Sequence, residues 1–307
     1  MNAPFRLLVA ALAALALPAC TPAAEAASKW QSVYPSSKQK SVTVADQGVT
    51  VIVTPAPPYD EDADDTHDSF RNSYEDATVD VQFPGLPAFR VPKDEFRSSP
   101  YGISVGIGRL NRQDATPTVL LSGYTGGMHC CATLQVVSLV DGQPVVDTLP
   151  AMDGEPLGRF PRDIDGDGTI DIRWFDDSLL YQFTSHAGSW QVPRIYAIER
   201  GHLVDVSREP RFAPVFRDFA RETLDACRKG EAGHNGACAA YAYATAVLGQ
   251  ADQGIRTAVS LAEASDWLPS ECTVAYVDDM CPEGKEMTFD GFEQGLRWIM
   301  HKNGYLP

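Results

Sequence analysis

The stretch that decides the fold class is SVTVADQGVTVIVT, residues 41–54. Its valines recur at every second position on both sides of Gln47 and Gly48, which is the pattern of a β-hairpin. Further short apolar segments, each bounded by Gly, Pro, Asp or Asn, continue to about residue 208 and begin near Val79, Ile103, Val119, Leu134, Ile170 and Ile195. This spacing predicts a mainly antiparallel β fold, either a sandwich or a partial propeller, and argues against alternating strand and helix units.

The apolar period changes in the last third of the chain. Apolar residues between Val215 and Cys227 fall on one face of a helix, and residues 238–249 are rich in Ala and end at a Gly. Two further helical patterns follow at residues 255–264 and 289–300. The predicted fold class is therefore α+β, with a β domain over residues 41–210 and a small helical module over residues 211–307.

The N-terminus has the features of an export signal. Within residues 1–20, Arg6 precedes an apolar run that is shorter than the roughly 20 residues of a membrane span. The sequence LPAC resembles a bacterial lipobox, which implies a lipid on Cys20, whereas AEA at residues 24–26 offers a competing site for ordinary cleavage. We expect a lipoprotein that faces the periplasm from the bacterial cell envelope, or a secreted protein. Residues 21–40 are predicted to form a flexible tether.

Composition limits the partners. The 307 residues include 41 Asp+Glu against 25 Lys+Arg, so the formal net charge of −16 argues against nucleic-acid binding. The acidic run at residues 60–65 is interpreted as a solvated loop, because contiguous like charges repel one another. The expected partners are the membrane, through a lipid anchor, and an envelope protein or a glycan.

Export also decides how the cysteines are interpreted. Of the 7 cysteines, those other than Cys20 form an even set, which indicates disulfides in an oxidising compartment. The simplest local pairs are Cys227 with Cys238 and Cys272 with Cys281, each of which closes a short polar loop.

The segment Gly127-Met128-His129-Cys130-Cys131 leaves four interpretations open. His129 could activate a thiolate nucleophile, His and Cys could bind a soft metal, the cysteines could form disulfides, or they could be unpaired buried thiols. The disulfide interpretation is favoured, because adjacent side chains on a strand point to opposite faces and cannot both reach one metal.

The strongest motif is DIDGDGTID, residues 163–171. Its side-chain oxygens at positions 1, 3, 5 and 9, the carbonyl at position 7 and the Gly at position 6 match the spacing that surrounds calcium with oxygen. Trp174 occupies the place of the bidentate Glu of an EF-hand, and the flanks are strand-like, so a calcium loop in a β context is predicted. The alternative is an Asp/Gly-rich hairpin turn that binds no ion. The predicted ligands are Asp163, Asp165, Asp167, Thr169 and Asp171.

This motif resembles the FG-GAP and VCBS type of repeat, which carries D-x-D-G-D-G-x-x-D loops between propeller strands. The resemblance covers roughly residues 100–208 and implies calcium as the bound ion in an exported bacterial protein. A degraded copy at residues 109–119 has Arg109 and Gln113 in place of two carboxylates, so no ligand role is assigned to it. Two such units cannot close a propeller.

No catalytic signature is present: the sequence lacks H-E-x-x-H, G-x-S-x-G and P-loop patterns. The predicted function is therefore a non-enzymatic calcium-binding protein with a binding or structural role. The alternative is an envelope hydrolase or thiol enzyme that uses His129 with Cys130 or Cys131. A third hypothesis, a glycan platform, involves aromatic residues that are otherwise interpreted as core, namely Trp174, Phe175, Tyr181, Phe183 and Trp190.

Overall fold

The computed structural model describes residues 28–33, 41–55, 77–92, 102–111, 113–125, 131–230, 233–265, 267–275, 277 and 280–307. The predicted export signal with Cys20, the acidic run at 60–65 and the segment Gly127 to Cys130 lie outside the described residues.

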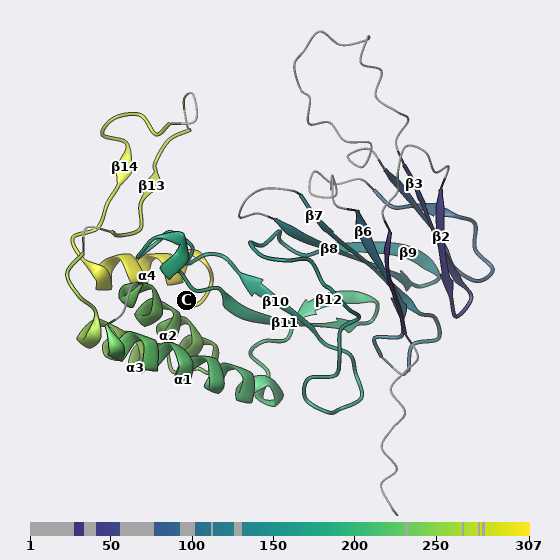
Figure 1. The fold of residues 1–307 in the computed structure, drawn as a ribbon. Helices are drawn as coiled ribbons and strands as arrows, with labels where there is room; N and C mark the ends of the chain where they lie inside the picture. Colours follow the sequence, from purple (N-terminus) through teal and green to yellow (C-terminus); the bar gives the residue numbers. More distant parts are fainter. Residues whose placement is uncertain are drawn as a thin grey trace, which may run out of the picture.

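Three antiparallel sheets and a group of helices follow one another through the described part of the protein (Figure 1). The first sheet has the order β2 (Val42–Asp46), β3 (Val49–Thr54), β4 (Thr78–Gln82) and β5 (Phe89–Arg90). The second has the order β1 (Lys29–Val33), β6 (Ile103–Gly108), β7 (Thr118–Tyr124), β8 (Ala132–Val140) and β9 (Gln143–Thr148). The third consists of β10 (Ile172–Asp176), β11 (Val192–Glu199) and β12 (His202–Asp205).

Alternation of side chains along the strands creates a separate hydrophobic core between successive layers. Val51 of the first sheet and Val105 of the second share one core. Leu120, on the opposite face of the second sheet, shares another core with Trp174 of the third sheet. The second sheet is thus covered on both faces, which explains why β7 and β8 are almost continuously buried.

The hairpin at residues 41–54 forms as its sequence predicts. Strands β2 and β3 pair from Val42 with Val53 to Asp46 with Val49. Gln47 and Gly48 between them have φ angles of 48° and 83°, the left-handed backbone of the tight turn that matches strand twist. The expectation of mainly antiparallel sheets followed by helices is confirmed for the described residues, whose paired strands are all antiparallel.

The expected tether at residues 21–40 is wrong for residues 29–33, which form edge strand β1. This strand pairs with β6, with Lys29 opposite Ile107 and Val33 opposite Ile103. The indole of Trp30 lies over Gly106, where a Cβ atom would be 2.7 Å from the ring. Strand formation here depends on a partner 70 or more residues away, so the local composition gave no sign of it.

The helices α1 (Ala213–Lys229), α2 (His234–Val247), α3 (Ala251–Leu261) and α4 (Phe292–Lys302) lie where the helical patterns predicted them. They share a core with one face of the third sheet, in which Ile195 and Phe216 are both fully buried. A small hairpin of β13 (Glu271–Cys272) and β14 (Glu286–Met287), which the sequence did not predict, separates α3 from α4. None of the described helices is long and apolar enough to cross a membrane.

Candidate metal centre

The loop at residues 163–171 lies where two cores meet. An isolated bridge between Arg162 and Asp171 closes it, and β10 follows directly. Ile170 is buried in the core between the second and third sheets, and its amide donates to the Leu110 carbonyl at 2.6 Å. Ile164 packs against the helical core. The loop is therefore anchored to the sheets on one side and to the helices on the other.

Backbone amides of the loop orient its carboxylates. Asp163 accepts hydrogen bonds from the amides of Gly166 at 2.6 Å and Gly168 at 2.8 Å. Gly168, at the sixth position, has a φ of 90°, which is the left-handed conformation that favours glycine. Asp171 accepts the Ile164 amide at 2.9 Å through Oδ2. The expected sharp turn is thus present.

Three of the five predicted ligand residues come together. One carboxylate oxygen from each of Asp163, Asp165 and Asp171 lies within 4.8 Å of the other two. Calcium–oxygen distances are about 2.3–2.6 Å, so two oxygens on one calcium ion are at most about 5 Å apart and the cluster fits that ion. Among the described residues, no other group of three or more His, Cys, Asp or Glu is arranged in this way.

Asp171 is the most unusual member of this cluster. Its side chain is 1% exposed, and the buried Oδ1 atom has no hydrogen-bond partner. Burial, together with the nearby charges of Asp165 and Asp167, raises the pKa of Asp171 to about 6. A buried, unpaired carboxylate oxygen is costly unless a cation or a donor satisfies it, so this atom favours a cation site.

Asp167 faces a different partner, which the sequence analysis missed. Its Oδ2 atom lies 2.5 Å from Nη1 of Arg211, and the same guanidinium lies 3.4 Å from Asp165. Burial alone would raise the pKa of Asp167, but the hydrogen bonds from Thr169 and the charge of Arg211 outweigh this effect and lower it. Thr169 was predicted to offer its carbonyl, and its amide donates to Asp167 at 2.7 Å.

Arg211 makes two further contacts. Its Nε atom donates to Glu209 at 2.7 Å, and its guanidinium carbon lies 4.7 Å from the ring centroid of the fully buried Phe212. Arg211 is 44 residues from Asp167 in the sequence and immediately precedes α1. The acidic loop could have suggested that a basic side chain lies nearby. The sequence does not indicate which arginine this is.

The degraded upstream copy forms a loop that is held by hydrogen bonds. Arg109 donates to the Asp114 carbonyl at 3.1 Å and to the Gln47 side chain at 3.0 Å. Asp114 in turn accepts the amide of Asn111 at 3.1 Å. The arginine thus connects this loop to the β2–β3 turn, and the described residues of the loop form no cluster of carboxylates.

The cysteines pair locally. Disulfides join Cys227 to Cys238 and Cys272 to Cys281, as their spacing predicted. Cys131 is also disulfide-bonded, and its partner lies outside the described residues because the other four described cysteines are paired with one another. Cys131 is therefore not a free thiolate in this structure, and His129 and Cys130 lie outside the described residues.

The aromatic residues after the loop are mostly core. Trp174 and Phe183 are 1% and 2% exposed, and the Trp174 indole donates to the Pro150 carbonyl at 2.8 Å. Tyr181 differs, with 52% of its surface exposed and its ring 5.3 Å from that of His186. Nε2 of His186 contacts the carboxylate of Asp153, and the sequence analysis did not anticipate this contact.

Comparison with known proteins identifies the family. The chain is 30% identical over 247 residues to the probable thylakoid lumen protein sll0997 of Synechocystis sp., an alignment that covers 78% of this chain and 70% of that protein. The family described as the sll0997 C-terminal domain matches residues 216–304. The chain belongs to the sll0997 family. No solved structure matches it.

A second relative of this sll0997 family member is the uncharacterized protein y4bJ of Sinorhizobium fredii. It is 28% identical over 210 residues, which are 64% of this chain and 31% of y4bJ. The chain thus spans about a third of y4bJ. The C-terminal domain match begins inside α1 and ends just after α4, so the loop at residues 163–171 lies outside it. The resemblance to FG-GAP and VCBS repeats stays a prediction.

Proposed function

We propose that this member of the sll0997 family is an exported, non-enzymatic protein in which a calcium ion holds the loop at residues 163–171. The ion would fasten the third sheet to the segment that leads into α1. Its ligands would be Asp163, Asp165 and Asp171, with Asp167 and the Thr169 carbonyl completing the shell when Arg211 moves aside. The protein would then have a binding or structural role.

The buried Oδ1 atom of Asp171 carries this proposal. It has no donor within the described residues, it is shielded from water, and its carboxylate shares a cluster with Asp163 and Asp165. A simple Asp/Gly-rich turn would orient its carboxylates toward solvent or backbone amides, and Asp171 Oδ1 faces neither. Calcium takes six to eight oxygen ligands, so it would satisfy this atom together with its neighbours.

The test is calorimetric titration of calcium into the mature protein, with thermal melts in calcium and in chelator. Wild type is expected to bind calcium with a dissociation constant on the order of micromolar to millimolar and to melt at a lower temperature in chelator. Asp165→Ala should abolish both effects. The matched control is Asp218→Ala, because Asp218 pairs with Arg221 on the exposed face of α1. If wild type shows neither binding nor a melting shift, the loop is a turn and the proposal fails.

Export to an oxidising compartment is supported by two independent observations. The Synechocystis relative is named a probable thylakoid lumen protein. The two local disulfides are typical of proteins in oxidising compartments. A lipid on Cys20 remains part of the proposal. Metabolic labelling with palmitate would test it: label that is lost in Cys20→Ser supports the anchor, and unlabelled wild-type protein excludes it.

A further inference from the structure

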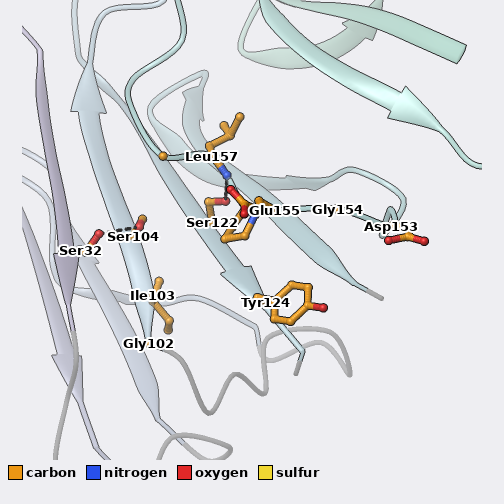
Figure 2. A pocket seen from close by; sticks show the side chains of 12 residues that line it. Ser32, Gly102, Ile103, Ser104, Ser122, Tyr124, Asp153, Gly154, Glu155 and Leu157 are labelled. Atoms are coloured by element: carbon orange, nitrogen blue, oxygen red, sulfur yellow. Dashed lines mark hydrogen bonds between the residues drawn. The ribbon is translucent and has the colours of Figure 1, made fainter. Parts of the chain in front are cut away.

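A cavity of 630 Å³ lies on the second sheet, away from the carboxylate cluster. Its floor is formed by β1, β6 and β7, and its opposite wall by the segment from Asp153 to Gly158 (Figure 2). Small-molecule sites commonly have volumes of about 300–1,000 Å³. The cavity is therefore large enough for an organic ligand.

The floor is built from one row of hydroxyl groups. Ser32, Ser104 and Ser122 are direct cross-strand partners on β1, β6 and β7, so their side chains share one face of the sheet. The hydroxyls of Ser32 and Ser104 lie 3.1 Å apart, and Ser122 accepts the amide of Leu157 at 3.0 Å, which ties the wall to the floor (Figure 2).

The cavity exists because this face of β6 carries only small residues. Gly106 and Gly108 of the same face are covered, since a Cβ atom on them would lie 2.7 Å from Trp30 and 2.6 Å from Phe160. Gly102 and Ser104, further along, line the cavity instead. The same strip of small residues is thus filled by aromatic rings at one end and open at the other.

The lining has a definite chemical character. Its described residues offer the hydroxyls of Ser32 and Ser104, the ring and hydroxyl of Tyr124, and the carboxylates of Asp153 and Glu155, and no Lys or Arg is among these described lining residues. Hydroxyls both donate and accept hydrogen bonds, whereas carboxylates only accept them. An anionic ligand would face two like charges in a protein of net charge −16. The lining suits a neutral ligand with many hydroxyl groups beside an aromatic face.

We propose that this cavity is a binding site for a neutral carbohydrate of about one to two sugar rings. Ser32, Ser104 and Glu155 would hydrogen-bond the sugar hydroxyls, and Tyr124 would contact a ring face. The buried Ser122 hydroxyl already donates to the Thr133 carbonyl and accepts the Leu157 amide, so it shapes the floor. Asp153 at the wall is held by His186, whose ring leads to the exposed Tyr181. A longer glycan would leave the cavity toward that aromatic side chain. This site is independent of the proposed calcium loop.

The experiment uses the full mature chain with maltose and N,N′-diacetylchitobiose as probes, and with spermidine and inorganic phosphate as charged competitors. Saturation-transfer NMR followed by calorimetry should show saturable binding of a disaccharide at a concentration below ~10 mM. Ser104→Leu places a branched side chain in the cavity and should weaken binding by about tenfold or more. Glu155→Ala, in an exposed wall position, should also weaken it without disturbing the sheet. Ser260→Leu, on the exposed face of α3, is the matched control.

Each result decides the proposal. Disaccharide binding that is lost in Ser104→Leu and reduced in Glu155→Ala, but is unchanged in Ser260→Leu, supports it. The absence of binding by both disaccharides overturns it, as does binding that both cavity variants leave unchanged. Displacement of the sugar by spermidine or phosphate would also overturn it, because the site would then recognise charge. If Ser104→Leu melts far below wild type, Glu155→Ala alone decides.

Discussion

Arg211, in the segment that leads into α1, forms an ion pair with Asp167 of the acidic loop, with Nη1 and Oδ2 2.5 Å apart. The contact joins the β layers to the helices through charge as well as through the shared core. It also places a positive charge beside the carboxylates that we propose as calcium ligands. The arginine and a calcium ion would therefore compete for the same oxygens.

Replacement of Arg211 by Met is expected to raise calcium affinity. The variant removes the competing charge and keeps a long apolar side chain near Phe212. Because Arg211 is 31% exposed and Asp167 39% exposed, the gain should be modest, about two- to fivefold in the dissociation constant. Calorimetry measures it, and Arg221→Met in the exposed pair with Asp218 is the control. Weaker calcium binding in Arg211→Met would mean that the arginine shapes the loop for the ion.

Asp171→Asn should have opposite effects in chelator and in calcium. In chelator the variant is expected to be about 1 kcal/mol more stable to unfolding than wild type, because a neutral amide is less costly to bury than an unpaired carboxylate. In millimolar calcium the order should reverse, since a charged ligand is lost. Urea unfolding in both conditions measures the difference. Asp163→Asn is the comparison: it replaces one of the two oxygens that accept backbone amides and should destabilise the protein in both conditions.

The hydroxyl of Tyr305 should stabilise the junction of the third sheet with the C-terminal residues. Tyr305 is 3% exposed and donates to Asp176 at 2.8 Å, while Arg194 contacts the same carboxylate at 2.9 Å. Tyr305→Phe is expected to lower the free energy of unfolding by about 1–2 kcal/mol. Tyr241→Phe, at the margin of the helical core, should change it less. Equal losses in the two variants would show that the hydrogen bond contributes little.

Stability should fall in acid, partly through Asp176. Burial alone would raise the pKa of Asp176, but hydrogen bonds from Ser178, Arg194 and Tyr305 outweigh it and lower the pKa below its ordinary value. The stabilisation is therefore present above the pKa of an unfolded Asp, near 4, and is lost as the pH falls through the lower folded value. Denaturant unfolding between pH 5 and roughly pH 2 should show a shallower decline for Asp176→Asn than for wild type.

Asp177, the next residue, should act with the opposite sign. Burial raises its pKa, and the nearby Asp153 and Asp176 add to that rise. Its protonation in acid therefore favours the folded state and offsets part of the loss due to Asp176. Asp177→Asn should make the decline steeper than in wild type. Parallel pH profiles for wild type and the two variants would contradict both assignments.

Gly254 should be intolerant of any side chain. A Cβ atom at this position of α3 would lie 1.7 Å from the hydroxyl oxygen of Thr245 on α2. Gly254→Ala is expected to cost about 1–3 kcal/mol of stability through overpacking. The double variant Thr245→Ala/Gly254→Ala should recover part of that loss, because the obstructing hydroxyl is removed. Thermal melts of the two single variants and the double variant measure the recovery, and strictly additive losses would refute the contact.

The sequence was most informative where a pattern repeats locally. The valines of residues 41–54 predicted β2 and β3, and the helical period around Phe216 predicted α1, because one buried face imposes the spacing. Edge strands β1, β9 and β12 were missed, since their residues are only partly buried and carry weak alternation. Trp30 lies in strand β1, where it pairs with Gly106 of β6. No local sequence pattern predicts that pairing.

The candidate sites divide in the same way. The carboxylate spacing at residues 163–171 is local, so three clustered residues could be predicted from it. Arg211 and Asp167 are 44 residues apart in the sequence, and Asp153 and His186 are 33 apart. Neither contact could be predicted from a local sequence pattern. The sequence has small residues at positions 102, 104, 106 and 108. Which of them are covered by aromatic rings depends on where Trp30 and Phe160 lie in the fold.

The helical core also bears on how this protein can be divided. The segment shared with the C-terminal family starts at residue 216, inside α1. Yet the apolar side of that helix is completed by Ile195, Phe183 and Leu179, which all come earlier in the chain. A fragment that begins at the family boundary would lack the first residues of α1. Its apolar helical face would be exposed to solvent, so the fragment should aggregate when expressed alone. The segment that the C-terminal family describes is therefore smaller than the unit that can fold.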